Sequence, residues 1–261
     1  MNASKPRILI ATPAYTGMVT TNYLTSLLQL TGQLKNVDFS IQYTDYSLIC
    51  KQRNFFLSRL LLEDFTHLLF IDADMGYSPE AIQSLIDFNQ PITACAYPTR
   101  TMDWSDMQQA AREHNTLDQA KAHGLKFVCE SDLNASVIKN LTNDGKQLTL
   151  RANKFINCTQ SGTGLMLIQK TVAEQMKEQF PELWCTQPQN PYPAFGKLDG
   201  ILQVFEAMQN EHGQFISEDF SFCKRWVEGC GGEIWVNIKD PIVHSGKMTF
   251  QSAFLDRFVA S

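Results

Sequence analysis

Apolar runs and amphipathic helical patterns alternate along the first hundred residues, and this alternation constrains the fold more than any other feature. Apolar or alternating runs predict strands over residues 7–15, 38–46, 67–71 and 91–97. Helical spacing of apolar residues predicts helices over 21–34 and 50–64, and a third helix that Ser78 caps and Pro79 begins. Strands that alternate with helices form a parallel sheet with helices on its faces. We therefore predict an α/β fold, with ligands bound beyond the carboxyl ends of its strands.

The second part of the chain carries a weaker pattern. It predicts a polar helix over residues 104–123, a turn at Asn143, Asp144 and Gly145, a strand over 165–168, a loop over 180–200, a helix over 217–228, one or two strands over 234–243 and an apolar face over 254–259. No internal repeat or clear linker interrupts the chain, and 261 residues suit one large α/β unit. We therefore predict one domain in two parts, residues 1–100 and 101–261.

Composition argues against several classes of protein. Apolar residues make up 44% of the chain and charged residues 19%, which supports a large core and argues against disorder. The net charge of −5 and the absence of a dense Lys/Arg tract argue against an extended nucleic-acid surface. We recognise no signal peptide and no apolar run of membrane-spanning length. Seven cysteines without a C-x-x-C motif argue against a disulfide framework or a zinc cluster and favour a cytoplasmic protein.

The sharpest chemical feature is Asp72-Ala73-Asp74, which follows the predicted strand over residues 67–71. Two carboxylates one residue apart can face the same pocket if the chain turns at the end of the strand. Mg²⁺ and Mn²⁺ prefer such oxygen ligands, and a metal held there could bridge a diphosphate. The alternative interpretation is a pair of polar residues that end a strand before a turn.

Two further groups of polar residues occur late in the chain. Glu218 and Asp219 could supply a general base, although acidic residues after a Ser217 cap also stabilise an ordinary helix start. His244 follows an apolar strand and could complete a metal site, whereas a lone histidine is more often structural. Lys247 could neutralise a phosphate or could simply be a solvated surface lysine.

Residues at other predicted strand ends are candidates for ligand binding. Arg53 lies near the start of a predicted helix, where anions bind well, and Tyr15 could stack on a base. Gly162 and Gly164 allow a ligand to approach the backbone closely. Thr12 and Pro13 lie at the end of the first strand. Each of these residues also has an ordinary structural interpretation, as part of a helix face or a turn.

Six motifs in order resemble a known family. They are ATPAY, KQRN, LLFIDADM, SGTGLMLI, SEDFSFCKRW and VHSG. Together they resemble the GT-A class of nucleotide-sugar glycosyltransferases, in particular the family-2-like enzymes of bacteria and their phages. The resemblance covers residues 7–247 and is thinnest between 101 and 153. It implies a Rossmann-like three-layer α/β/α sandwich with a mostly parallel central sheet. It also implies that residues 1–100 form the nucleotide-sugar-binding half and residues 101–261 the acceptor-binding and catalytic half.

The resemblance also implies roles for individual residues. Asp74 would ligate Mn²⁺ or Mg²⁺ directly, Asp72 would help to hold the metal and the donor ribose, and His244 would be the third metal ligand. Asp219 matches the catalytic base of inverting members, and Glu218 would orient the acceptor. The positions that match donor-binding positions are Thr12, Pro13, Tyr15, Asp45, Arg53, Asp72, Ala73, Gly162, Gly164 and Lys247. Asp45 departs from the family, because Thr44-Asp45-Tyr46-Ser47 replaces the usual acidic, glycine-containing pattern.

The implied reaction is a single displacement that inverts the anomeric carbon of a UDP- or GDP-sugar. The acceptor stays open among a glycan, a lipid-linked sugar, a protein and a modified nucleobase, as do the sugar and the oligomeric state. A nucleotidyltransferase and a non-catalytic nucleotide-sugar-binding protein on the same fold are alternatives. A haloacid-dehalogenase-like phosphatase is a weaker alternative, because Gly76 stands where those enzymes carry Thr or Val.

We also expect donor and metal to order the 180–200 loop or the 250–259 segment. The location would be the cytoplasm, or the host cytoplasm if the protein is viral.

Overall fold

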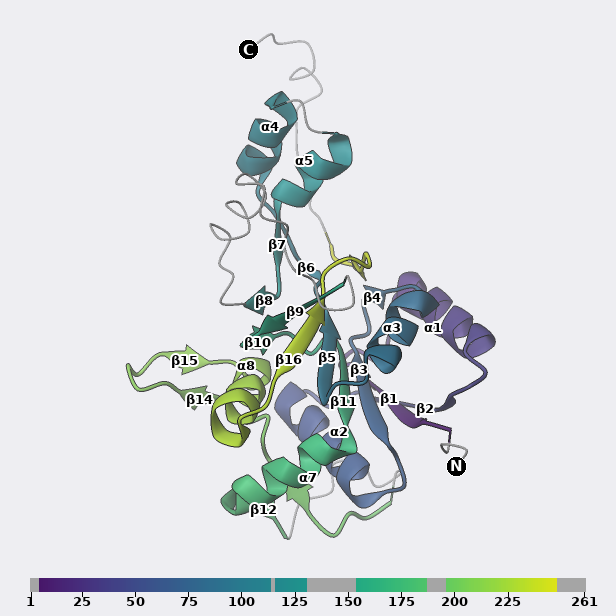
Figure 1. Cartoon of the computed structure of the whole chain (residues 1–261), viewed down its shortest axis with the longest axis vertical. Coiled ribbons are helices and arrows are strands. Elements are labelled where there is room, and N and C mark those ends of the chain that lie inside the picture. The colour runs from purple at the N-terminus through teal and green to yellow at the C-terminus, as the bar shows by residue number, and fades with distance from the viewer. Residues whose placement is uncertain (1–4, 114–115, 131–153, 187–195, 248–261) are drawn as a thin grey trace.

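The computed structural model describes residues 5–113, 116–130, 154–186 and 196–247 (Figure 1). The predicted turn at residues 143–145, the apolar face at 254–259 and the 250–259 segment lie outside these residues, as does much of the predicted 180–200 loop.

A seven-stranded sheet forms the centre of the molecule, in the order β2-β1-β3-β11-β5-β16-β9. Its strands are β1 (Arg7–Pro13), β2 (Asp38–Thr44), β3 (His67–Ile71), β5 (Ile92–Cys95), β9 (Phe155–Cys158), β11 (Leu165–Gln169) and β16 (Ile234–Asn237). β1 pairs in parallel with β2 and β3, and β5 pairs in parallel with β16. β11 is antiparallel to both β3 and β5, and β9 is antiparallel to β16. Five strands therefore run one way and two the other, which confirms the predicted α/β fold with a mostly parallel sheet.

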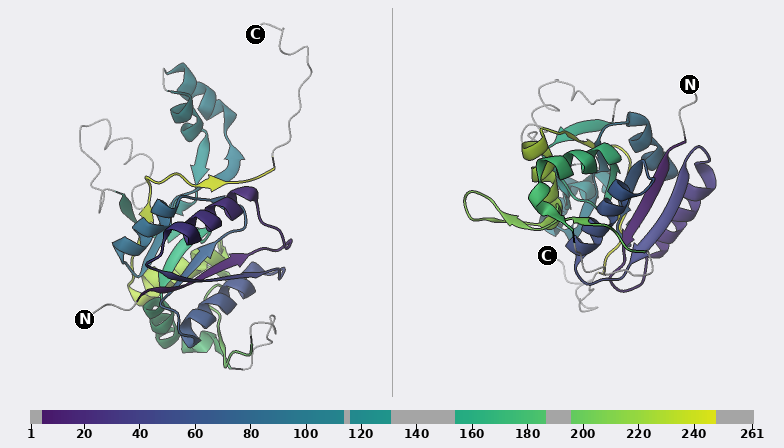
Figure 2. Two further views of the ribbon diagram at one scale, coloured as in Figure 1. Left: turned by 90° about the vertical axis from the view of Figure 1, so that its right-hand side faces the viewer. Right: turned by 90° about the horizontal axis from the view of Figure 1, so that it is seen from below.

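Helices cover both faces of this sheet (Figures 1 and 2). One face carries α1 (Thr21–Gln33) and α3 (Pro79–Phe88), and the other carries α2 (Ile49–Leu62), α7 (Lys170–Gln179) and α8 (Glu218–Lys224). Successive side chains of a strand point to opposite faces. In β3, Phe70 joins the core with Phe56 of α2, whereas Ile71 joins the core with Ile82 of α3. Each buried strand thus supplies two cores, and the three-layer prediction is confirmed.

The predicted helix starts have their expected local chemistry. The Thr20 hydroxyl accepts a hydrogen bond from the backbone N–H of Tyr23 at 3.3 Å and caps α1. Ser78 caps α3 in the same way through the N–H of Ala81, and Pro79 occupies the first turn. Side-chain caps satisfy N–H groups that the helix itself leaves free. These two caps place the N-termini of α1 and α3 beside the residues that follow β3.

The part of the chain that follows β5 and precedes β9 includes a helical extension, which projects away from the sheet (Figure 1, and Figure 2, left). Its elements are β6 (Pro98–Met102), α4 (Trp104–Arg112), α5 (Leu117–His123) and β7 (Leu125–Phe127). The single helix predicted over residues 104–123 was wrong. Thr116 caps a new helix in a capping box with Gln119, so α4 and α5 are separate helices. Neither main core includes a residue of α4 or α5.

Short elements complete the described chain. They are β4 (Met75–Gly76), β8 (Cys129–Glu130), β10 (Gln160–Ser161), a 3-10 turn at Pro181–Leu183, β12 (Trp184–Cys185), β13 (Ile201–Leu202), β14 (Met208–Gln209), β15 (Phe215–Ile216), a π-helical segment at Arg225–Gly229 and β17 (Val243–His244). β12 pairs with β13, so the predicted 180–200 loop begins with ordered structure. None of the described helices combines the length and hydropathy needed to cross a bilayer.

Candidate functional site

Three segments hold the turn at residues 72–74 in place through its backbone. The N–H of Asp72 donates to the carbonyl of Gly164, just before β11, at 2.9 Å. The carbonyl of Ala73 accepts from the N–H of Thr20 at 2.9 Å, and the carbonyl of Asp74 accepts from the N–H of Ser245 at 2.9 Å. The turn lies at the carboxyl end of β3, where α/β folds bind their ligands. Its two carboxylates are therefore presented from a rigid support.

Asp74 and His244 lie side by side because β4 pairs with β17, which places His244 opposite Met75. His244 Nε2 is 3.5 Å from Asp74 Oδ2. Nδ1 of the same ring lies 2.8 Å from the carbonyl oxygen of Pro98. A carbonyl only accepts, so Nδ1 carries a proton. In the protonated ring Nε2 also carries a proton and donates to Asp74. In the neutral ring Nε2 instead carries a lone pair. This arrangement is the one in which Nε2 is available to a cation.

The charges of this pair perturb each other. Burial alone would raise the pKa of Asp74, but the hydrogen bond with His244 and the charges of His244 and Arg100 hold that pKa below its usual value. The hydrogen bond with Asp74 raises the pKa of His244. Asp74 therefore stays ionised in a partly buried position, as a metal-ligating carboxylate must.

Asp72 behaves differently from Asp74. Burial raises the pKa of Asp72, and the charges of Asp74 and Asp219 add to this effect, while Arg53 and His244 oppose it. Its nearest cation is Arg53, with Nη2 at 3.7 Å from Oδ1. Among the residues that the structure describes, this buried Oδ1 has no hydrogen-bond partner. Burying a carboxylate oxygen without a hydrogen-bond partner destabilises the fold. A hydrogen-bond donor of a ligand, or a cation, would remove that penalty.

Arg53 joins the turn at residues 72–74 to the second acidic pair. It lies on α2 with a side chain that is 4% exposed, and its Nη1 donates to Glu218 Oε1 at 2.6 Å. Asp219 instead accepts from two neutral donors, the hydroxyl of Ser217 and the N–H of Phe220. Ser217 stands at the cap position of α8, but its side chain donates to Asp219 and does not cap the helix. Arg53 thus forms an ion pair with Glu218, whereas no ion pair of Asp219 is found among the described residues.

The glycine motif before β11 makes room for Tyr97. A Cβ atom added at Gly162 would lie 2.0 Å from the Tyr97 hydroxyl oxygen, and one at Gly164 would lie 2.6 Å from Cε of Met75. The N–H of Gly164 donates to the Tyr97 hydroxyl at 3.1 Å. Burial, together with the nearby charge of Asp72, raises the pKa of Tyr97. Tyr97 therefore stays uncharged and packs against the turn that carries Gly162 and Gly164. The sequence analysis did not single out this residue.

The residues predicted to hold the nucleotide are spread over two loops. Tyr15, after β1, is 67% exposed, and Asp45, after β2, is also exposed. The N–H of Ala14 donates to the carbonyl of Thr44 at 2.7 Å and ties these loops together. Pro13 ends β1, whereas the hydroxyl of Thr12 is buried and shares a 2.6 Å hydrogen bond with the hydroxyl of Tyr23. The exposed loops are available to a ligand, but the Thr12 hydroxyl is used within the fold.

A cationic cavity adjoins Asp74. It has a volume of about 210 Å³ and is lined by Thr99, Arg100, Thr101, Met102, Leu125, His244, Gly246 and Lys247. Arg100 Nη1 donates to Asp74 Oδ2 at 2.9 Å. Arg100 was not predicted to be a site residue, because its position after the predicted strand over residues 91–97 carries no distinctive pattern. Lys247 is exposed at the edge of this cavity.

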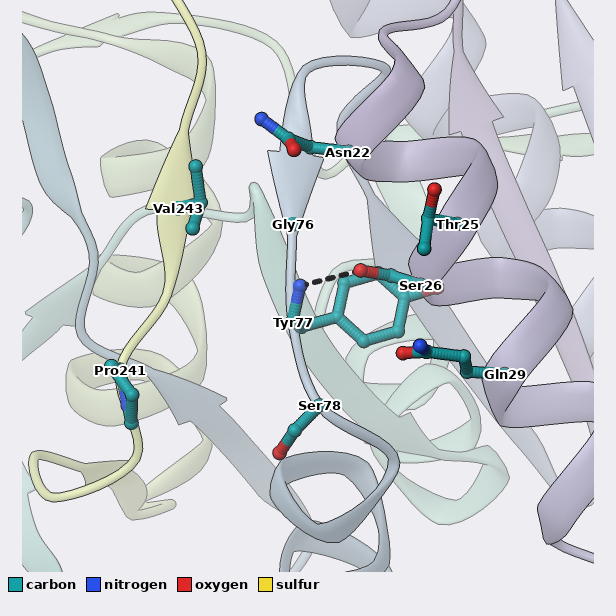
Figure 3. Close-up of a pocket in the computed structure, with 9 residues that line it drawn as sticks. All are labelled: Asn22, Thr25, Ser26, Gln29, Gly76, Tyr77, Ser78, Pro241 and Val243. Carbon is teal, nitrogen blue, oxygen red and sulfur yellow. Dashed lines mark hydrogen bonds between the residues drawn. The ribbon is translucent and has the colours of Figure 1, made fainter.

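A second cavity lies behind the β4–β17 pair, against α1 (Figure 3). It has a volume of about 320 Å³ and is lined by neutral residues: Asn22, Thr25, Ser26, Gln29, Gly76, Tyr77, Ser78, Pro241 and Val243. Ser26 accepts a hydrogen bond from the N–H of Tyr77 at 2.8 Å, and Asn22 donates to the hydroxyl of Ser245 at 2.9 Å (Figure 3 shows the first). Through these two hydrogen bonds, α1 holds the β4–β17 strand pair, which carries His244, in place.

The side chains fit a divalent cation in chemical type. Asp74 and His244 offer one oxygen and one nitrogen, and the unpartnered oxygen of Asp72 lies close enough for these charges to influence it. Within the described residues, however, no three His, Cys, Asp or Glu side chains converge into a ready-made metal site. Mg²⁺ and Mn²⁺ are commonly held by one or two protein carboxylates, with the remaining ligands supplied by waters and substrate phosphates. The residues present match that kind of partial site.

Comparisons with known proteins identify no family for this chain. The chain matches no protein-family model, and a search of curated proteins gives no significant match. Among solved structures, A197 from STIV is 13% identical, with a TM-score of 0.47, 92% of this chain covered and 86% of that chain. A protein described as a glucose-1-phosphate thymidylyltransferase from Bacillus anthracis, in complex with sucrose, is 10% identical, with a TM-score of 0.28 and coverages of 66% and 74%. Such distant likenesses carry no argument about function, which must come from the site.

Proposed function

We propose that this protein is a metal-dependent GT-A glycosyltransferase that moves a sugar from a nucleoside-diphosphate donor to an acceptor hydroxyl with inversion. The observation that carries the proposal is the pairing of Asp74 with His244 Nε2 at the carboxyl end of β3, with Nδ1 anchored on the Pro98 carbonyl. An acidic turn with a histidine beyond a parallel strand suits the binding of a metal and a diphosphate. Residues 1–100 would hold the nucleotide, and residues 101–261 the acceptor.

Asp74 and His244 would hold Mn²⁺ or Mg²⁺, with the unpartnered oxygen of Asp72 beside them. Such a cation supplies Lewis-acid stabilisation to the diphosphate as it leaves. Arg53 compensates the charges of Asp72 and Glu218 and so keeps both acids in fixed positions. The exposed Tyr15 and Asp45 lie on the loops where base and ribose would bind.

Asp219 is the better candidate for the general base. One oxygen of Glu218 is occupied by the Arg53 guanidinium, whereas within the described part of the chain Asp219 accepts hydrogen bonds from neutral donors alone. In the proposed step, the acceptor hydroxyl gives its proton to the Asp219 carboxylate. Its oxygen bonds to the anomeric carbon as the bond from that carbon to the phosphate oxygen breaks, and the nucleoside diphosphate leaves with the bonding electrons.

A thermal-shift panel of nucleotide-sugars with and without Mn²⁺ tests the donor site. Ligands that bind only the folded state raise the melting temperature, and a ligand at 100 times its Kd adds about 2.7 kcal/mol. We expect a UDP- or GDP-sugar to stabilise the wild type only with Mn²⁺, Asp74→Asn to lose this stabilisation and Asp219→Asn to keep it. No Mn²⁺-dependent shift with any nucleotide-sugar would refute the proposal.

A product assay separates sugar transfer from its rivals. Sugar transfer releases a nucleoside diphosphate, whereas nucleotidyl transfer releases pyrophosphate. We expect wild-type turnover to release the diphosphate and Asp219→Asn to reduce the rate at least about 100-fold, the usual contribution of general base catalysis. A retained anomeric configuration in the product would overturn the role of Asp219. Mn²⁺-dependent binding without any turnover by the wild type would favour a binding protein.

A further inference from the structure

Arg100 pairs with the oxygen of Asp74 that also faces His244. Its Nη1 lies 2.9 Å from Asp74 Oδ2, the oxygen that is also 3.5 Å from His244 Nε2. A guanidinium and a divalent cation would compete for the same lone pairs and would repel each other at that distance. Metal binding at Asp74 therefore requires the guanidinium of Arg100 to leave this oxygen.

The stem of Arg100 packs on Gly246, and its guanidinium has a cavity beside it. A Cβ atom added at Gly246 would lie 3.0–3.1 Å from Cβ, Cγ and Cδ of Arg100, so the stem of this side chain lies directly on the glycine backbone. The side chain is 57% exposed, and it lines the 210 Å³ cavity together with Lys247. A change of the outer χ angles can turn its head from Asp74 into this cavity while the stem stays on Gly246.

We propose that Arg100 is a resident cation that neutralises Asp74 in the metal-free protein and, once a divalent cation displaces it, binds the diphosphate of the donor beside Lys247. This inference rests on the proposed function and adds a donor-binding residue to it. Before the metal arrives, Arg100 reduces the repulsion between Asp74 and the nearby Asp72. After displacement, guanidinium groups bind phosphate oxygens through paired hydrogen bonds, a geometry that lysine lacks.

This arrangement couples the two ligands. The metal must break the Arg100–Asp74 pair, which weakens its binding when no nucleotide is present. The displaced Arg100 then strengthens nucleotide binding, so each ligand raises the affinity of the other, as linkage requires. An arginine that only supported the fold would not affect the two affinities in opposite directions.

The test is calorimetric titration of Arg100→Met, which keeps an apolar stem on Gly246 but removes the charge. We expect Mn²⁺ alone to bind about 3-fold more tightly than to the wild type, since a partly exposed ion pair contributes only modestly. We expect UDP or GDP, whichever the wild type binds at saturating Mn²⁺, to bind at least about 10-fold more weakly, because hydrogen bonds between charged groups are stronger than those between neutral groups.

Lys247→Met is the matched control, because Lys247 lines the same cavity and no ion pair with Asp74 is found for it among the described contacts. It should weaken nucleotide binding and leave the affinity for Mn²⁺ alone unchanged. Arg100→Lys keeps the charge and serves if Arg100→Met does not fold; it should leave the affinity for Mn²⁺ close to the wild-type value and weaken nucleotide binding.

The outcomes separate this inference from the proposed function. Equal or weaker binding of Mn²⁺ by Arg100→Met, while the wild type binds Mn²⁺ and nucleotide, overturns the inference and leaves the function standing. Unchanged nucleotide affinity in Arg100→Met also overturns it. Absence of Mn²⁺ binding in the wild type and in every Arg100 variant removes the metal site on which both depend. Binding of Mn²⁺ by Arg100→Met but not by the wild type supports both.

Discussion

At the scale of single residues, Asp240 shows a carboxylate used for stability away from the candidate site. It accepts hydrogen bonds from Lys154 at 2.8 and 3.0 Å, from Asn237 at 2.7 Å and from Ser84 at 3.1 Å. Burial would raise the pKa of Asp240, but the bonds from Lys154 and Asn237, the charge of Lys154 and the Ser84 hydroxyl hold it below the ordinary value. This residue joins α3, the end of β16 and the residue before β9.

The lowered pKa makes the contribution of Asp240 to stability dependent on pH. The folded carboxyl binds its proton less tightly than the unfolded one, so the contribution is fully present above the ordinary pKa of about 4 and is lost as the pH falls through the folded value. We predict that Asp240→Asn lowers the free energy of unfolding by about 1–2 kcal/mol at pH 7. The difference from the wild type should shrink toward pH 3, as measured by urea denaturation.

Asp38→Asn is the control for this prediction. The exposed Lys5–Asp38 pair, at 2.8 Å, should contribute no more than about 1 kcal/mol. A loss of stability in Asp240→Asn that is as large at pH 3 as at pH 7 would show that lost packing, and not the charge, explains the effect.

Residue chemistry that is local in sequence could be predicted, and chemistry that depends on distant partners could not. Asp72, Asp74 and His244 were singled out because carboxylates and a histidine directly after apolar runs are visible in the local sequence, and because their order resembles that of a known family. The contacts of Arg100 and Tyr97 with Asp74 and Gly164 join strands far apart in the chain. No spacing rule reports such contacts. The sequence likewise suggested a Ser217 cap on α8, whereas the Ser217 hydroxyl donates to Asp219, and the sequence does not distinguish these two uses of a serine.

At the scale of secondary-structure elements, the strongly periodic segments were predicted within a few residues of their ends. Those segments include β1, β3, α1, α2 and α3. The helix α7 was missed, although Val172, Ala173 and Met176 form its buried stripe. The antiparallel insertion of β11 between β3 and β5 was also not predicted, because strand order depends on pairing across the whole chain and not on local pattern.

The turn before β11 should tolerate no side chain at Gly162. A Cβ atom there would meet the Tyr97 hydroxyl oxygen at 2.0 Å and Cγ1 of Val128 at 2.7 Å. Overpacking of a filled interior costs about 1–3 kcal/mol. We predict that Gly162→Ala lowers the free energy of unfolding by this amount in urea denaturation, and that adding Tyr97→Phe costs less than the two single changes together, because the residues share one contact.

Gly32→Ala is the matched control for Gly162→Ala. Gly32 lies in α1, and an added Cβ would meet nothing within 4 Å. Alanine in a helix should stabilise by about 0.5–1 kcal/mol relative to glycine. Equal effects of the two substitutions would contradict the packing of Tyr97 against the turn.

At the scale of the whole molecule, the sheet domain and the helical extension form separate units of packing. The two main cores draw most of their residues from the sheet and from the helices on its faces, and none from α4 or α5. The extension is connected to the sheet domain through β6 and β7, which pair with Met102 opposite Leu125. The N–H of Asp103 donates to the carbonyl of Gly124 at 2.8 Å, so the two ends of the helical pair already lie together.

This separation suggests a deletion that tests where the acceptor binds. Replacing residues 103–124 by Asn-Gly would join Met102 to Leu125 through a two-residue turn, the preferred connection between antiparallel strands. Arg100 and the strands of the sheet domain would remain. We predict that the shortened chain folds, keeps the thermal shift with Mn²⁺ and nucleotide, and still hydrolyses donor slowly, but loses transfer to the acceptor. The reason is that β6, from which the extension projects, contacts the candidate site through Arg100 and Pro98, and that the extension belongs to the half proposed to bind the acceptor.

Circular dichroism, thermal shift and a transfer assay would check this prediction on one preparation. Loss of the nucleotide shift together with transfer would mean that the extension supports the donor site. Full transfer by the shortened chain would move acceptor binding to another part of residues 101–261. The β14–β15 hairpin, which projects to the left in Figure 1, is then the next part to remove, because it leads directly into Ser217 and Asp219.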